Sequence, residues 1–267
     1  MKQRDKKHHG FTLIELIIVI VLLGIVGAMG AGFISTAFKG FFDTDVRMEM
    51  YEEGKSALVR MEREIHIAVP NAVQVFNNDV KADSGNEIRF GVIEETTAAG
   101  QYSESGSNIN GLPPSKLISI YNTQWCNFEH SPSPDCTATD KSRIYTSDAT
   151  GAIAIAAIDT LSPYQRYFVV RSEAVRFCVL QDPTDITKKN LYRGTAQVNA
   201  GAVLETFGND QLLARHVKQS SNNLDYFTYK PGTSTRNSVV TINFAISSPN
   251  GDETVNFHKE VQVRNVP

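Results

Sequence analysis

Residues 11–34 form an apolar run of 24 residues in which Glu15 is the only charged side chain. As an α-helix, such a run extends about 36 Å at ~1.5 Å per residue, enough to cross a ~30 Å hydrocarbon core. The ten residues before it carry four basic side chains and one acidic side chain. Because basic residues before a first membrane helix favour a cytoplasmic location for that end, we expect a single-pass protein whose later residues lie across the membrane.

The helical pattern continues beyond this run as an amphipathic segment over residues 35–69, with charged residues on the face opposite the apolar one. We expect the second half of its apolar stripe to pack on the following domain, and Arg60 and Glu64 to pair on the exposed side. Pro70 is expected to end the helix. The apolar positions are Phe38, Phe42, Val46, Met50, Ala57, Met61, Ile65 and Ala68.

From residue 71 onward the apolar pattern changes to the alternation typical of β-strands. Polar segments at 96–116, 181–190 and 230–237 are expected to be loops, and Asn250-Gly251 predicts a hairpin turn. The expected strands are 73–76, 87–93, 117–121, 166–172, 174–180, 225–230, 238–247 and 253–266. The predicted fold class is α+β, with a long N-terminal helix, half membrane-spanning and half amphipathic, packed on a mostly antiparallel β-sheet domain.

The chain contains three cysteines, of which Cys126 and Cys136 flank a turn-rich stretch that looks like a loop closed by its ends. In an oxidising compartment they would form a disulfide worth about 3 kcal/mol, and the alternative is two unpaired thiols. Cys178 lies in a stretch that alternates like a strand, so we expect a buried free thiol there. The sequence has no CxxC pair and no matching histidine spacing, which argues against a zinc site.

The N-terminal sequence is a short basic leader ending in Gly10, followed by Phe11, Thr12, Leu13, Ile14, Glu15, Leu16 and the apolar run. It closely resembles the processing signature of type IV pilins and of type II secretion pseudopilins. The resemblance implies that a prepilin peptidase cleaves between Gly10 and Phe11 on the cytoplasmic side and methylates the new N-terminus on Phe11. It also implies an assembly charge pair between Glu15 and the Phe11 amine of a neighbouring subunit. The alternative is a glutamate in the first helical turn, favoured by the helix dipole and reaching the headgroups.

Two further stretches, 57–75 and 258–267, resemble minor subunits of these systems. They are similar to the J-type minor pseudopilin and still more to the O-type minor pilin of the mannose-sensitive haemagglutinin (MSHA) pilus. This resemblance implies a minor pilin assembled into or at the tip of a type IV pilus, or alternatively a minor pseudopilin of a type II secretion system. The implied partners are prepilin peptidase, other pilin or minor pilin subunits through the N-terminal helix, and an inner-membrane assembly platform.

The implied organisation is a leader (1–10), a transmembrane helix (11–34), its amphipathic continuation (35–69) and a periplasmic β-rich globular domain (70–267). The chain would lie in the bacterial inner membrane as a single-pass protein and enter a pilus or pseudopilus after processing. Gly24, Ala28 and Gly32 recur every fourth residue, a spacing that lets helices approach closely in lipid.

The sequence contains no GxSxG elbow, Walker A loop, HExxH motif or paired glycine fingerprint, so it predicts no enzyme, catalytic residue or cofactor. His258 and Glu260 share one face of an expected strand, but two ligands are too few for a metal site. The Asp/Asn-rich stretch 77–87 has Lys81 where a calcium loop needs an oxygen ligand, so we expect a turn. Trp125 and Phe128 are expected in the core beside the disulfide rather than in an exposed contact patch.

A rival hypothesis is a membrane-anchored or secreted periplasmic enzyme or binding protein with an ordinary signal sequence. The tripeptide at 28–30 offers a small-x-small site for conventional signal cleavage, which would leave a chain starting at Ala31. Glu15 within the apolar run and the missing catalytic motifs argue against this rival. Without the leader the net charge changes from −3 to −6, which argues against nucleic-acid binding.

Overall fold

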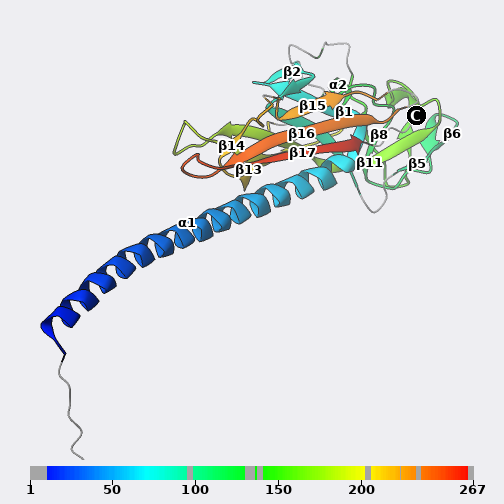
Figure 1. The fold of residues 1–267 in the computed structure, drawn as a ribbon. Helices are drawn as coiled ribbons and strands as arrows, with labels where there is room; N and C mark the ends of the chain where they lie inside the picture. Colours follow the sequence, from blue (N-terminus) through cyan, green and yellow to red (C-terminus); the bar gives the residue numbers. More distant parts are fainter. Residues whose placement is uncertain are drawn as a thin grey trace, which may run out of the picture. The chain divides into compact units, whose positions relative to one another are not determined.

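A computed structural model describes residues 11–94, 99–129, 136, 141–201, 206–222, 224–232 and 236–263 of the chain (Figure 1). The chain divides into two compact units, Met1–Glu49 and Met50–Pro267. One long helix, α1 (Leu13–His66), supplies the described structure of the first unit almost entirely and continues into the second, where antiparallel sheets follow it. The predicted α+β fold class is confirmed.

The second half of α1 is amphipathic, and its buried positions follow one helical stripe. These positions are Met50, Gly54, Ala57, Met61, Glu64 and Ile65, which are separated by steps of three and four residues or lie adjacent. The expected packing of this half is therefore confirmed. Phe38 and Phe42, at the start of the predicted stripe, are exposed.

The helix ends at His66, so the prediction that it extends to residue 69 is wrong. Strand β1 (Ala68–Asn77) begins two residues later because Ala68 pairs with Val92 of β4 (Glu87–Ile93). Residues 68 and 69 therefore belong to β1, and the helix ends before Pro70.

The larger sheet joins strands that are distant in sequence, and all its pairings are antiparallel. Its main order is β13 (Gly208–Ala214), β12 (Lys189–Gln197), β11 (Arg166–Gln181), β4, β1 and β2 (Val80–Ala82). The first part of β11 pairs instead with β5 (Ala99–Gln101) and β8 (Leu117–Ser119), and β8 also pairs with β9 (Ile144–Thr146). A register shift between Val170 and Ala174 separates the two parts of β11.

A second sheet contains the predicted C-terminal hairpin. Strands β16 (Ser238–Ser247) and β17 (Thr254–Val263) pair along their full lengths, and Gly251 in the connecting turn has φ +81°. The other side of β16 pairs with β14 (Val217–Lys218) and β15 (Phe227–Lys230), and β15 pairs with β3 (Ser84–Gly85). A small third sheet has the order β10 (Ile153–Ala154), β7 (Asn108–Asn110) and β6 (Ser103–Ser105), and η1 (Ile155–Ala157) follows β10.

Several strand predictions need correction. The segments 166–172 and 174–180 form one strand, β11, and the expected loop at 96–116 contains β5, β6 and β7. Strands β12 and β13 were not predicted at all. Residues 78–79 form the expected turn of the 77–87 stretch, and Lys81 lies in the short strand that follows.

Arg60 and Glu64 pair as predicted, but Glu64 is not on the exposed side of the helix. Glu64 is only 9% exposed, and its carboxylate accepts hydrogen bonds from Arg60 Nε at 3.1 Å and from Arg193 Nε of β12 at 2.8 Å. The prediction that Glu64 faces solvent is therefore wrong, because a strand far along the chain covers it with a counter-charge.

Two other acidic residues of α1 also contact the sheets. The Glu53 carboxylate accepts a hydrogen bond from the backbone N–H of Arg215 at 2.9 Å. Glu62 Oε1 lies 2.8 Å from Lys259 Nζ of β17. Polar contacts as well as the apolar stripe therefore hold the second half of α1 on the sheets.

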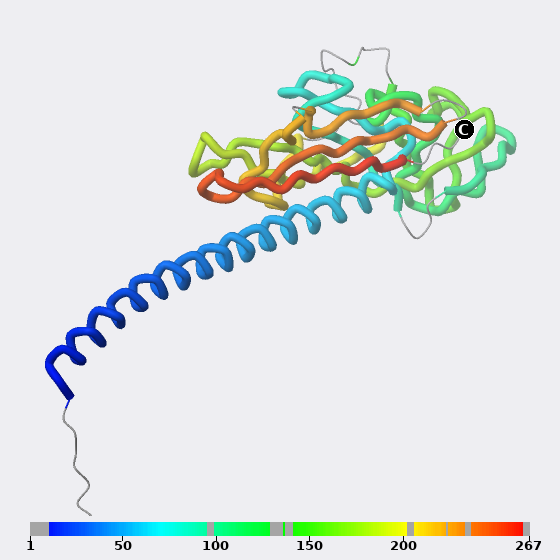
Figure 2. The backbone as a smooth tube through the Cα atoms, viewed as in Figure 1, coloured from blue at the N-terminus to red at the C-terminus, as the bar shows by residue number. Residues whose placement is uncertain are grey.

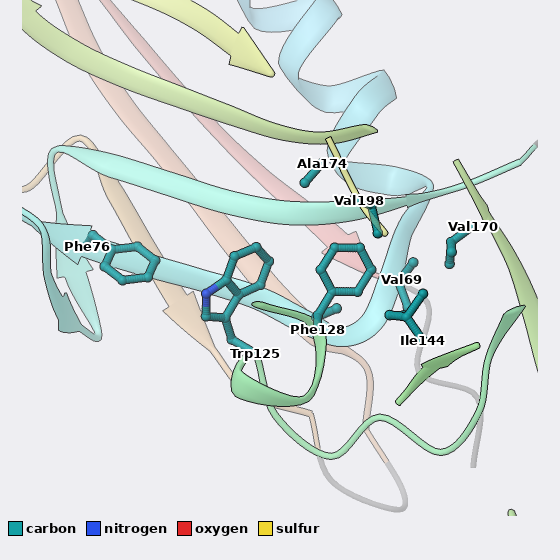
Figure 3. Close-up of a cluster of buried hydrophobic side chains, with 9 residues drawn as sticks. Val69, Phe76, Trp125, Phe128, Ile144, Val170, Ala174 and Val198 are labelled. Carbon is teal, nitrogen blue, oxygen red and sulfur yellow. The ribbon is translucent and has the colours of Figure 1, made fainter. Parts of the chain in front are cut away.

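A short helix, α2 (Cys126–Glu129), contributes Phe128 to one of the core clusters, and Trp125 precedes this helix (Figure 3). The rings of Trp125 and Phe128 stack 5.6 Å apart, and both residues are 2% exposed. Gly91 of β4 leaves room for the Phe128 ring, because a Cβ at Gly91 would lie 2.3 Å from that ring. The predicted core position of Trp125 and Phe128 is confirmed.

Candidate functional site

The start of α1 is built by a side-chain cap. Thr12 Oγ1 accepts a hydrogen bond from the backbone N–H of Glu15 at 3.4 Å, and the Thr12 carbonyl accepts one from Leu16 at 3.2 Å. Thr12 and Glu15 occupy the first and last positions of the S/T-x-x-E capping box. We did not infer this role of Thr12 from the sequence, although the spacing signals it. Gly10 lies outside the described residues.

Glu15 lies in the first turn of α1 and has an exposed side chain. Among the described residues its carboxylate enters no ion pair, and Phe11 is 84% exposed. A charged side chain at the centre of a membrane helix costs about 2.5–3.5 kcal/mol on insertion scales, and ionisable groups within membrane helices are usually paired. The structure places Phe11 and Glu15 within one turn of each other but records no contact between them.

The first half of α1 is apolar on every side. Its large apolar side chains between Phe11 and Ile34 are 45–84% exposed, and an 18-residue window of α1 has a mean hydropathy of 2.7. A helix that is apolar all round lies in a protein core or in a bilayer, and no described residue covers this window. By length and composition, α1 can therefore cross a membrane.

The glycines of this half have no role in contacts within the described chain. A Cβ added at Gly24, Gly27, Gly30 or Gly32 would meet nothing within 4 Å. Small residues at such spacings let a second helix approach closely in lipid, where packing rather than the hydrophobic effect holds helices together. The space beside them is therefore open to another helix.

The cysteines take the positions expected from the sequence. Cys126 and Cys136 form a disulfide with Cα atoms 5.5 Å apart, which anchors the start of α2. Cys178 is a buried free thiol in β11, and burial raises its pKa to about 12. Because the thiolate is the reactive form, this residue is chemically inert in the folded protein.

The described residues offer little that resembles a catalytic or metal centre. No group of three or more His, Cys, Asp or Glu side chains in this part of the chain is placed to hold a metal ion. His258 Nδ1 pairs with the Asn243 side chain of the neighbouring strand, and Lys259 between His258 and Glu260 pairs with Glu62. The local contacts of His258 thus belong to the sheet.

Comparison with known proteins gives one match. Residues 5–31 match the family described as the prokaryotic N-terminal methylation motif. Searches of the curated proteins and of the solved structures found no match to the chain. The matched residues contain Gly10, Phe11 and Glu15 and all but the last three residues of the apolar run, but none of the sheets.

The motif and the helix together support a class for this protein. The motif precedes and includes the start of a helix long enough to cross a membrane, which fits a membrane-anchored, type IV pilin-like prepilin. A prepilin motif in turn implies a prepilin peptidase and other pilin subunits as partners. Proteins of this kind are generally structural rather than enzymatic.

Proposed function

We propose that the chain is a minor pilin, processed by prepilin peptidase and assembled into or at the tip of a type IV pilus of the MSHA type. The observation that carries this proposal is the methylation motif at 5–31, joined by one continuous helix to a large antiparallel β domain. The similarity of 57–75 and 258–267 to O-type minor pilins supports this subtype. The second candidate is a minor pseudopilin of a type II secretion system, which the likeness to the J-type pseudopilin favours.

The proposal assigns a location to each part of the chain. Residues 1–10 are a cytoplasmic leader, 11–34 span the inner membrane, 35–66 continue the helix and 67–267 form the rest of the periplasmic domain. An inner-membrane assembly platform then incorporates the processed subunit through its helix. The all-round apolar surface of residues 11–34 supports this layout.

Glu15 has a defined part in this assembly. Cleavage between Gly10 and Phe11 creates a cationic amine on Phe11, and methylation keeps its charge. Glu15, which lacks a counter-ion among the described residues, pairs with this amine on a neighbouring subunit. Two charges that are costly in lipid are then neutralised only when subunits assemble, and the pair sets the axial register between their helices.

The first test is the intact mass of the mature protein purified from its host. The expected mass corresponds to a chain that begins at Phe11 and carries one methyl group. A chain that begins at Ala31 would favour a conventional signal sequence and the enzyme or binding-protein hypothesis, and retention of Met1 would also refute processing.

The second test replaces the proposed charge partner. Glu15→Ala should be processed as the wild type is, but its amount in sheared surface filaments should fall at least tenfold. Glu52→Ala is the matched control, because Glu52 is an exposed carboxylate of the same helix outside the apolar run. Normal assembly of Glu15→Ala would refute the charge pair.

A third measurement separates the two assembly systems. The methylated chain should be found in sheared surface filaments if it is a minor pilin. Its absence from them, combined with loss of protein secretion when its gene is deleted, would favour the pseudopilin instead.

A further inference from the structure

A cleft of about 340 Å³ lies beside β12, β14 and β16 in the second unit. Lysines from two separate segments line it, together with His216, Tyr226 and Ser247. Figure 2 shows that the turns at 181–188 and 248–253, which flank these strands, lie at the same end of the domain. No part of the motif at 5–31 contributes to this cleft.

Asn190 and His216 hold the three segments of the cleft together. Asn190 is 3% exposed, and its Nδ2 donates a hydrogen bond to Asp182 Oδ2 at 2.7 Å. Its Oδ1 accepts a hydrogen bond from the backbone N–H of His216 at 3.1 Å. The His216 carbonyl accepts hydrogen bonds from the backbone N–H and the Oγ of Ser247, at 3.1 and 3.2 Å. Partly buried hydrogen bonds therefore hold the segments of the lining together.

The charged side chains among the described lining residues of this cleft are all lysines. Lys188, Lys189 and Lys218 line it, and none of the lining residues that the structure describes is an Asp or a Glu. Lys188 has a partial partner in Asp185, whose Oδ2 lies 3.6 Å from its Nζ. Lys189 and Lys218 form no ion pair with any described residue. Such a cluster is unusual in a chain of net charge −3, and a bound anion would relieve its repulsion.

Tyr226 adds a hydrogen-bond donor to the lining. It is 5% exposed and lines the cleft, and its hydroxyl makes no hydrogen bond to a described residue. Burial raises the pKa of Tyr226, so its hydroxyl stays protonated and can donate. The Lys189 ammonium lies 6.0 Å from the centroid of the same ring.

We propose that this cleft binds a single phosphate group, supplied either by free phosphate or by a phospholipid headgroup. Lysine ammonium groups act as point charges that suit phosphate, whereas bidentate carboxylate recognition favours the guanidinium fork, and no arginine is among the described lining residues. Lys189, Lys218 and Tyr226 are hydrogen-bond donors that line the same cleft, and a phosphate has acceptor oxygens for them. The net negative charge of the chain disfavours a long polyanion.

The test is isothermal titration of the full chain in a non-ionic detergent and a dilute Tris buffer with inorganic phosphate. The wild type should show saturable one-site binding, and Lys189→Ala/Lys218→Ala should weaken it at least tenfold. Tyr226→Phe, which removes one oxygen atom, should weaken binding severalfold without disturbing the fold. The control is Lys55→Ala/Lys230→Ala, which removes the same charge from exposed lysines outside the cleft and should stay within twofold of the wild type.

Two further ligands define the chemistry. Glycerophosphoglycerol, a soluble phosphodiester headgroup, should bind as tightly as phosphate if the source is a lipid and more weakly if it is free phosphate, and both results support the site. Acetate should bind at least tenfold more weakly than phosphate. The proposal is overturned if the wild type shows no saturable phosphate binding, if the control weakens it equally, or if acetate binds as tightly.

Discussion

Gly54→Ala tests how the second half of α1 is held on the sheet. Gly54 lies on the buried face of α1, where an added Cβ would lie 2.2 Å from Cζ and 2.3 Å from Cε2 of Phe257. These distances are more than 1 Å shorter than ordinary van der Waals contact. The Phe257 ring cannot easily retreat, because it stacks on Phe244 with centroids 5.0 Å apart and on Tyr51 at 6.3 Å.

Two opposing effects set the size of the change. Alanine is about 1 kcal/mol more favourable than glycine inside a helix, which by itself would stabilise the variant. Overpacking a well-packed contact costs about 1–3 kcal/mol and sometimes more, and a contact this short lies in the upper part of that range. We therefore expect Gly54→Ala to lower the free energy of unfolding by about 1–2 kcal/mol.

The assay is urea unfolding of the full chain in a non-ionic detergent, followed by the fluorescence of Trp125, the chain's single tryptophan. Gly40→Ala is the matched control, since a Cβ there meets nothing within 4 Å and should not lower the midpoint. Adding Phe257→Leu to Gly54→Ala should cost less than the sum of the two single changes. If Gly54→Ala is as stable as the wild type or more stable, the close packing of Gly54 against the Phe257 ring does not exist in solution.

Three further predictions concern charges and thiols of the same domain. Glu64→Gln should cost about 1–3 kcal/mol in urea unfolding, because it leaves the partly buried Arg193 without its counter-charge. Glu64→Leu/Arg193→Leu should cost less than Glu64→Leu alone. A smaller effect of Glu64→Gln than of Glu52→Gln would contradict the ion pair. Cys178 should resist iodoacetamide at pH 8 in the native protein and react after unfolding, as read by mass spectrometry, and rapid native labelling would contradict its burial. Hydrogen bonds from the Thr184 hydroxyl and backbone and from Asn190 lower the pKa of Asp182, so its stabilising effect is present above the unfolded pKa of ~3.9 and is lost as pH falls below it. Asp182→Asn should therefore make stability less steep between pH 4 and 2, and an unchanged slope in acid titration would refute this.

The sequence predicts α1 well because the signals that form this helix are local. An unbroken apolar run and a stripe with steps of three and four residues belong to the helix itself, whatever packs on them. Its C-terminal end is mispredicted because the pairing of Ala68 with Val92 is a tertiary contact. Glu64 is misplaced for the same reason, since its partner Arg193 lies 129 residues away.

The missed strands have weak patterns because the sheet determines them. β13 is exposed along most of its length, so nothing in its own sequence selects one apolar face. β11 looks like two strands because exposed residues interrupt it near Glu173, where the register shift lets one strand serve two sets of neighbours. β5, β6 and β7 are three residues each, too short for an alternating pattern to stand out.

The two candidate sites also differ in whether local sequence or tertiary contacts determine them. Gly10, Phe11, Thr12 and Glu15 are adjacent in the chain, so their motif can be read without a structure. The phosphate cleft brings together residues from 187–189, 216–219, 226 and 247, and only folding makes them neighbours. Scattered lysines carry no signal in a sequence that has 26 basic residues.

The acidic residues of α1 supply a physical argument for assembly through the helix. Where the helix docks on the sheets, the carboxylates of Glu53, Glu62 and Glu64 each have a donor within 2.9 Å. Glu15 has no ionic partner among the described residues and lies in the first turn of α1, at the start of the apolar run. The exposed carboxylates of Glu49 and Glu52 also form no ion pair with a described residue, so Glu15 differs from them in lying within the apolar run. In the proposed assembly, the cationic N-terminus on Phe11 of a second subunit would be the counter-charge of Glu15.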